Sequence, residues 1–385
     1  MKITLKNTPE QVELVKAMAS RDRNVAYEAQ TALAEFIGPV LAEVINQAPA
    51  LSNLFTTLQY NSDDNPSIPL DLYFDIADED YVQVYSQSRA GGLPTSEVLP
   101  TSAELKVTTY SIDSAVSFDR RYAAKSRMDV VAKTMTRVAQ EILLKQNTIS
   151  AQVILKALAA AETNGLKHVF SAAVDDRFVL ADLNALLTRS KRIMTSFAGG
   201  TPDARSGRGV TDIICAPEIV EELRSIAYNP INTKSAPAGP TGGDSVATPD
   251  FIAQQAFNAA GAPEFYGIGI IELNELGGFG TNTDEKFDKI FAQHAGSARY
   301  ARADGTSTSA EQFTAASDSL IIGIDRTRES LVRPVAVDAE NGAEFNLIAD
   351  DQYSIRQSKI GYFGSLEEGR IVLDDRALSG IIVQS

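Results

Sequence analysis

Apolar residues near the start of the chain recur at the spacing of amphipathic helices. In residues 8–22 they follow helical steps, Thr8 can cap the helix, and Pro9 suits its first position. A second helix is predicted from Tyr27 to Ile37, ended by the Gly38-Pro39 pair. Since neither helix has an apolar core of its own nearby, we expect an arm that packs on other parts of the structure.

The apolar period changes to two at Ile68 and keeps that spacing to Ile76, which is typical of a half-buried strand. A Gly/Pro-rich tip, Arg89 to Thr101, follows, and a second extended stretch runs from Glu104 to Val116. Within this stretch the apolar set shifts from odd to even positions, which predicts a bulge or bend near Thr108 and Thr109. Residues 66–118 are therefore predicted to form one long hairpin that projects from the body.

The longest periodic segment runs from about Asp119 to Glu162 and predicts a single helix. Its apolar residues follow steps of three, four and seven along one narrow stripe: Val131, Met135, Val138, Ile142, Ile149 and Val153. Such a helix would be about 65 Å long, and Asn164-Gly165 would end it as a C-cap. We expect it to act as a spine, with the hairpin attached at its start.

The rest of the chain alternates helices with short strands, which predicts a separate α/β lobe. The expected helices cover residues 180–195, 217–228 and 251–260, and the expected strands cover 211–215, 266–272 and 319–324. A Gly/Ser/Pro-rich linker, 229–249, interrupts the lobe. Strand-like segments return at 351–362, 370–374 and 380–383, and we expect these to pair beside the spine.

Composition and charge narrow the classes of function. With 385 residues the chain exceeds the usual single-domain size, so two lobes are expected. The 35 basic and 50 acidic residues give a net charge of -15, which repels a phosphate backbone unless basic residues cluster. Only short pairs such as Arg120-Arg121 and Lys191-Arg192 are visible, which argues against a sequence-specific nucleic-acid reader. A protein that merely encloses nucleic acid needs no strong affinity for it.

No signal peptide or membrane-spanning run is evident at either end or within the chain, and Cys215 is the single cysteine, so no intramolecular disulfide can form. We therefore expect a product of the cytoplasm that is soluble before any assembly and has no membrane partner.

The candidate chemistry is sparse. Two histidines, His168 and His294, exclude a three-histidine metal site. Cys215 closes a predicted strand just before a helix, where a nucleophile could lie, but no histidine is near in sequence, which favours a buried, apolar role. Acidic pairs such as Asp374-Asp375, and the glycines around Gly267 and Gly277, are typical of turns. No catalytic, cofactor or metal residue is assigned, and a soluble α/β enzyme with Cys215 as nucleophile is kept as an alternative.

Four local stretches, together with the order of the predicted parts, carry a family resemblance: Ser117–Arg121, Thr211–Glu218, Lys359–Gly361 and Asp375–Ile381. They resemble the Hong Kong 97 fold shared by tailed-phage major capsid proteins and encapsulin shells. The resemblance implies an α+β chain divided into an N-terminal arm and start of the peripheral domain (1–65), an extended β-hairpin loop (66–118), the peripheral-domain spine helix (119–175), an α/β axial domain (176–337) and returning peripheral-domain strands (338–385).

The same resemblance implies a structural role without catalysis or cofactors. Copies would form hexamers and pentamers of an icosahedral phage head around double-stranded DNA, without sequence-specific binding, after synthesis in the host bacterial cytoplasm. A separate scaffolding protein, a portal and decoration proteins are the implied partners. Some family members crosslink a loop lysine to a neighbour's asparagine; Lys106 lies on the predicted hairpin, but no motif identifies a partner. The alternatives are an encapsulin-like nanocompartment and a tail or baseplate protein.

Overall fold

The computed structural model of the chain describes residues 8–47, 51–61, 66–69, 104–163, 165–175, 177–193, 209–228, 264–265, 267–277, 286–303, 311–337, 344–350 and 357–384. Their contacts divide the chain into two compact units. Unit 1 contains the described residues up to Pro69, those from Glu104 to Ser150, and those from Leu331 to Ile371. Unit 2 contains the described residues from Ala151 to Ser330 and from Val372 onward.

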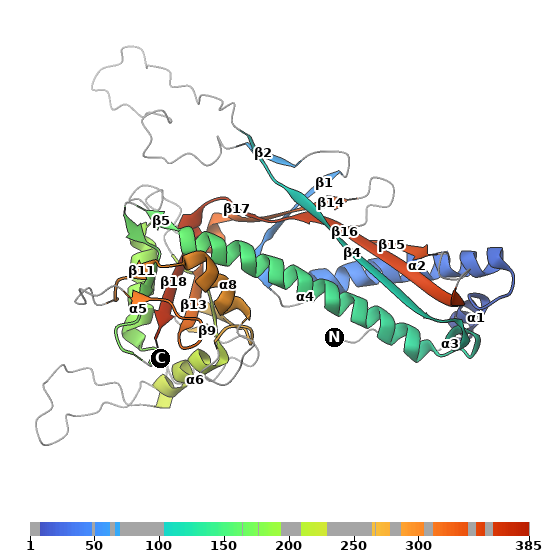
Figure 1. The fold of residues 1–385 in the computed structure, drawn as a ribbon, viewed down its shortest axis with the longest axis horizontal. Coiled ribbons are helices and arrows are strands. Elements are labelled where there is room, and N and C mark those ends of the chain that lie inside the picture. Colours follow the sequence, from blue (N-terminus) through green and yellow to red (C-terminus); the bar gives the residue numbers. More distant parts are fainter. Residues whose placement is uncertain are drawn as a thin grey trace, which may run out of the picture. The chain divides into compact units, whose positions relative to one another are not determined.

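Unit 1 is built on a sheet whose central member is β16 (Lys359–Gly369). This strand pairs antiparallel with β4 (Thr109–Asp119) over eleven positions, a long ribbon visible in Figure 1. On the other side it pairs with β15 (Asn346–Asp350) and, at one position, with β14 (Leu331–Val337). The parallel strand β1 (Thr56–Asn61) and the short β17 (Ile371–Val372) also pair with β14.

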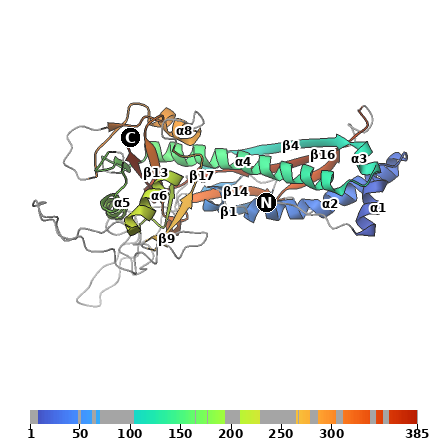
Figure 2. The ribbon, with the colours of Figure 1, turned by 90° about the horizontal axis from the view of Figure 1, so that it is seen from below.

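Helices cover one face of this sheet. They are α1 (Pro9–Ala17), α2 (Arg23–Gln47) and the first part of α4 (Met128–Ala160), and Figure 2 shows α2 and α4 along the β4 and β16 ribbon. The shared core contains Val15, Met18, Leu33, Ile37, Leu41, Ile112, Phe118, Val131, Met135, Val138, Ile142, Ile360, Tyr362 and Leu366. On the opposite face the directly paired Ile348 and Phe363 remain 47% and 36% exposed.

The N-terminal helices confirm the predicted helical pattern but not its end. Thr8 caps α1 through the amide of Gln11, and Pro9 takes the first helical position, as predicted. The prediction that Gly38-Pro39 ends the second helix is wrong, because α2 continues through Pro39. The ring of a proline normally clashes with the Cβ and the N–H of the preceding residue and disfavours the helical conformation there. Gly38 has no Cβ, so part of this clash is absent.

The predicted bounds of the single spine helix, Asp119 to Glu162, are also wrong at both ends. A short helix, α3 (Arg120–Ala124), precedes α4, and Ser126 between them adopts a left-handed conformation with φ 53°. The α4 helix has 33 residues, about 50 Å at the usual rise. It ends at Ala160, and Gly165 lies in the turn between β5 (Glu162–Thr163) and β6 (Leu166–Lys167), so it is no C-cap.

The predicted apolar stripe of the spine is confirmed along the first part of α4. Val131, Met135, Val138 and Ile142 are buried, whereas Ile149 and Val153 are only partly buried. Further along, the buried side chains are instead Gln146, Ser150, Ile154 and Leu158. The set of buried positions therefore shifts around the helix axis. An α-helix has about 3.6 residues per turn, so positions seven residues apart do not stay on the same face.

The base of the predicted hairpin is present. Strand β2 (Ser67–Pro69) pairs antiparallel with β3 (Glu104–Lys106), whereas residues 70–103, with most of the first predicted strand and the whole tip, lie outside the described residues. The expected bend is confirmed as a strand interruption at Val107 and Thr108. Beyond it, β4 belongs to the sheet of unit 1, so the prediction that the hairpin extends to residue 118 is wrong.

Unit 2 contains a second sheet in the order β7 (Val169–Ser171), β18 (Leu378–Val383), β13 (Ser319–Ile324), β8 (Asp212–Cys215), β10 (Ile268–Glu272) and β9 (Glu264–Phe265). Every residue of β13 and β18 is buried, as expected of central strands covered on both faces. The accompanying helices are α5 (Leu180–Ile193), α6 (Pro217–Tyr228) and α8 (Lys286–Ala295). Two short strands, β11 (Arg299–Tyr300) and β12 (Glu311–Gln312), pair separately.

The α+β class is confirmed, and several segments of the predicted lobe match closely, notably β8, β13 and α6. The linker 229–249 and the helix 251–260 lie outside the described residues. Two boundaries are wrong: β14, expected in the lobe, lies in unit 1, and β18, expected beside the spine with unit 1, lies in unit 2. None of the helices in the described ranges is long and apolar enough to cross a membrane.

Candidate functional site

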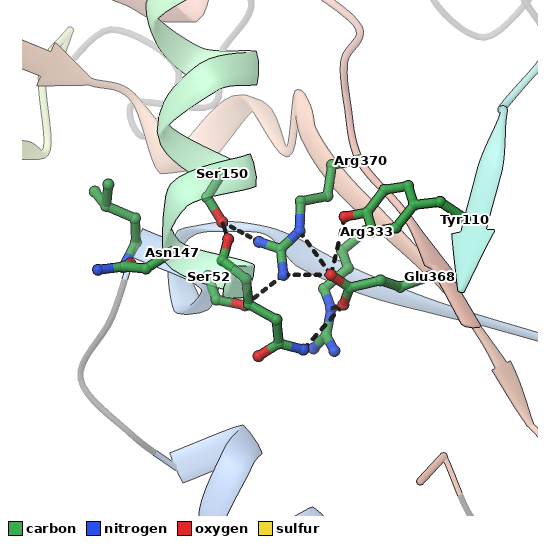
Figure 3. A network of polar contacts seen from close by, with 9 residues as sticks. Ser52, Tyr110, Asn147, Ser150, Arg333, Glu368 and Arg370 are labelled. Carbon is green, nitrogen blue, oxygen red and sulfur yellow. Dashed lines mark hydrogen bonds and ion pairs between the residues drawn. The ribbon is translucent and has the colours of Figure 1, made fainter. Parts of the chain in front are cut away.

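A buried polar network in unit 1 surrounds the carboxylate of Glu368, whose side chain is fully inaccessible to solvent (Figure 3). Arg333 Nε lies 2.7 Å from Glu368 Oε2, and Arg370 Nη2 lies 2.9 Å from Oε1. Both guanidinium groups are themselves buried. Two cations thus share one anion in a region of low polarity, where an uncompensated charge is costly.

Neutral donors and acceptors complete the network. Gln146 on α4 and Tyr110 on β4 each donate a hydrogen bond to the Glu368 carboxylate, at 3.1 and 2.9 Å. Arg370 donates to Ser52, at 2.9 Å, and to Ser150 on α4. Burial, followed by the negative charge of Glu368, raises the pKa of Tyr110 well above its usual value. The phenol therefore stays protonated and serves as a donor.

This network joins segments that are far apart in sequence. It connects the α4 helix, the strands β4, β14 and β16, and the 3₁₀ turn η1 (Leu51–Leu54). The backbone amide of Leu51 donates a hydrogen bond of 2.8 Å to the side-chain oxygen of Asn147 on α4. The arrangement holds the sheet of unit 1 against its helix and leaves no reactive group exposed. Sequence reasoning missed it, although Arg333 within the apolar run Leu331–Val335 was an available signal.

Cys215, the candidate nucleophile, is fully buried at the end of β8. Burial, and then the charge of Glu272, raises the pKa of its thiol to about 12. The thiol is therefore protonated near neutral pH, whereas nucleophilic cysteines are thiolates in accessible, electropositive surroundings. The prediction of a buried, apolar role is confirmed.

We expect Cys215 to resist a water-soluble thiol reagent in the folded protein at pH 8. Labelling should follow global or local opening, because the sulfur is both inaccessible and protonated. Mass spectrometry of the labelled chain, with and without urea, measures this directly. Rapid and complete labelling without denaturant would restore the enzyme alternative.

His168 is also fully buried, but it serves the structure of unit 2. Its Nδ1 lies 3.0 Å from the carbonyl oxygen of Leu378 and 3.1 Å from that of Asp375, so Nδ1 carries the proton. Its Nε2 then accepts from the hydroxyl of Thr163, at 2.8 Å. Burial lowers the pKa of His168 below its usual 6.5, although Asp375 and the two carbonyl groups oppose this shift.

The stability of unit 2 should therefore fall as the pH drops through and below 6.5. In that range the unfolded chain binds a proton at residue 168 that the folded chain does not, so stability present at neutral pH is lost. Urea unfolding between pH 7.5 and about pH 5 measures the slope, and His168→Asn should flatten it. His294→Asn, at the exposed histidine of α8, is the matched control for the substitution itself.

Asp374 and Gly267 lie in turns, as the sequence predicts, whereas Gly269 lies within β10 and Asp350 ends β15. Asp374 caps the 3₁₀ turn η4 (Asp375–Ala377) by accepting from the amide of Arg376. Burial raises the pKa of Asp374, but the hydrogen bonds and charges of Arg376 and Arg328 outweigh it and hold the pKa below its usual value. Gly267 turns the chain between β9 and β10 with φ 76°. In the described ranges no three acidic, histidine or cysteine side chains converge as a metal site.

Comparison with known proteins finds similar chains among solved structures, at low sequence identity. No protein-family model and no curated protein matches the sequence. Solved structures with similar chains include the satellite phage P4 procapsid with its size determination protein, at 10% identity, 90% coverage of both chains and a TM-score of 0.42. The mature capsid of bacteriophage PhiM1 has 10% identity, 87% coverage of both chains and a TM-score of 0.46.

The SrpI encapsulin complex of Synechococcus elongatus is similar to the same degree. Its identity is 11%, the aligned region covers 86% of this chain and 85% of the encapsulin chain, and the TM-score is 0.42.

Proposed function

We propose that this chain is the major capsid subunit of a tailed-phage head, a structural protein of the virion with a Hong Kong 97-type fold. The observation that carries the proposal is how the chain is threaded through its two units. Unit 1 draws its sheet from β1 and β4, before unit 2, and from β14, β15 and β16, after most of it. The part of unit 2 from Ala151 to Ser330 is therefore inserted between segments of unit 1, as the axial domain is in that fold. The chain then returns to unit 2 with β18, and α4 contributes residues to both units.

Two features of unit 1 suit a protein that completes its packing against copies of itself. Strands β2 and β3 pair with each other outside both six-stranded sheets, and a two-stranded pair is marginal in isolation. The Ile348 and Phe363 pair leaves apolar area on the sheet face opposite the helices. In the proposed shell, neighbouring subunits of hexamers and pentamers would cover such surfaces.

Electron microscopy of the purified chain tests the proposal. We expect closed, angular shells or hexameric rings, with a separate scaffolding protein improving the uniformity of the shells. A monodisperse monomer under all conditions, or open tubes, would count against a capsid subunit. The portal and decoration proteins of the proposed virion would be sought among proteins that purify with the particles.

The contents of the particles separate a phage head from an encapsulin-like compartment. A phage head isolated from a bacterial lysate should protect double-stranded DNA from nuclease. An encapsulin-like shell should instead contain a defined cargo protein and no genome. The net charge of -15 fits a container whose walls do not bind the enclosed DNA tightly.

A further inference from the structure

Unit 2 carries a hollow of about 540 Å³ beside the α5 helix. Its floor is Phe170, which is fully buried on β7. The guanidinium of Arg189 lies over this ring, 4.6 Å from the ring centroid, as in a cation–π pair. Arg192, one turn further along α5, and Lys167 on β6 also line the hollow.

The positive charge in this hollow is only partly compensated. Lys167 has an acidic partner, Glu162, at 3.4 Å. Within the described part of the chain neither Arg189 nor Arg192 forms an ion pair or a hydrogen bond. Burial lowers the pKa of Arg189, which means that its surroundings disfavour the charge it carries. An anion held against this guanidinium would offset that cost, because arginine binds a carboxylate through two parallel hydrogen bonds.

We propose that this basic hollow receives a carboxylate-bearing segment of a second copy of this chain, so that it is a subunit contact. The inference rests on the proposed function, since it needs copies that assemble. Charge complementarity identifies the occupant: the chain has 50 acidic against 35 basic residues, so a second copy presents a mostly acidic surface to this hollow.

The walls of the hollow favour a peptide over nucleic acid. Leu166, which is 56% exposed, and Ile193 give it apolar sides that can pack against the methylene groups of an acidic side chain. A nucleic-acid backbone is instead bound by a row of cations spaced along its phosphates. Two arginines that form no ion pair among the described residues lie one helical turn apart, and Arg189 lies over the ring of Phe170. This arrangement suits one or two carboxylates.

Charge reversal with a matched control tests the contact. Arg192→Glu and the double variant Arg189→Glu/Arg192→Glu should raise the protein concentration needed for assembly by about 10-fold or more, equivalent to about 1.4 kcal/mol per contact. Lys191→Glu makes the same charge change on the neighbouring residue of α5, outside the hollow, and should leave that concentration unchanged. Light scattering measures assembly, and circular dichroism checks that each variant remains folded.

A zero-length crosslink identifies the occupant. A carbodiimide condenses the amine of Lys167 with a carboxylate in contact, forming an amide and transferring the lost water to the reagent. In particles assembled from mixed ¹⁴N- and ¹⁵N-labelled chains, we expect mixed-isotope crosslinks between Lys167 and an Asp or Glu of a second copy. The Lys167 to Glu162 link within one chain is the internal positive control.

The outcomes separate this inference from the proposed function. If wild-type chains assemble, and the double variant assembles equally well with Lys167 linked only to Glu162, the contact is refuted and the shell stands. If no particle forms but mixed-isotope links at Lys167 persist in small oligomers, the contact stands and the shell proposal fails. Binding of a single-stranded oligonucleotide that the double variant abolishes, with assembly unaffected, would assign the hollow to nucleic acid and overturn the inference.

Discussion

Replacing Glu368 with glutamine is expected to destabilise unit 1 by about 3–5 kcal/mol, the usual cost of removing one partner from a buried ion pair. The substitution keeps the shape of the side chain but removes its charge. Arg333 and Arg370, both buried, would then lose their common anion, and two adjacent guanidinium groups would repel each other in a region closed to water. The loss should therefore exceed that of an ordinary hydrogen bond.

The neighbouring glutamate on the same strand offers a matched control. Glu367 is only partly buried and accepts hydrogen bonds from the hydroxyl groups of Tyr60 and Thr109, at 3.2 and 2.9 Å. Glu367→Gln should cost about 1 kcal/mol, since no buried cation depends on it. Urea unfolding of the unassembled subunit, followed by circular dichroism, compares the two variants. Equal losses would mean that the network around Glu368 contributes no more than surface polar contacts do.

The elements that the sequence predicted best are those whose signals are local. The sequence predicts the strand Ser319–Ile324 at its observed bounds because the segment is an apolar run. It predicts the helix Pro217–Tyr228 at its observed bounds because a proline marks the first helical position. The N-cap at Thr8 is likewise set by a bond to a residue three positions away. The turns at Asp374 and Gly267 are also local: the aspartate caps the turn that follows it, and the glycine adopts a positive φ.

The predictions are wrong where a helix end depends on one residue's backbone conformation, or where a strand's sheet depends on partners far along the chain. The break at Ser126 lies in a segment whose composition suits a helix, and a left-handed serine leaves no clear mark in sequence. The sheets that β14 and β18 join are decided by pairing with strands far along the chain. The Gln146 to Glu368 bond spans 222 positions, and the basic hollow combines β6 with α5, so neither site could be assembled from local patterns.

Gly364 on β16 illustrates such a distant constraint, and its substitution is the second large effect that we expect. The residue faces the helix-covered side of the sheet, directly against the buried ring of Phe345. A Cβ at this position would overlap the tip of that ring and lie 3.1 Å from its Cε2 atom. Gly364→Ala should therefore cost about 1–3 kcal/mol, the usual range for overpacking a core, because the buried ring has to shift to admit the new Cβ.

A double-mutant cycle tests whether the ring causes this loss. Phe345→Leu removes the atoms that a new Cβ would meet, so the combined Gly364→Ala/Phe345→Leu variant should be more stable than the sum of the two single losses predicts. Ser365→Ala, on the opposite face of the same strand, should change stability by less than about 0.5 kcal/mol. Strictly additive losses would instead place the cause in the backbone of β16. If Gly364 is required because the Phe345 ring lies so close, the losses of stability in the two single variants should not add, since the new Cβ and the ring compete for the same space.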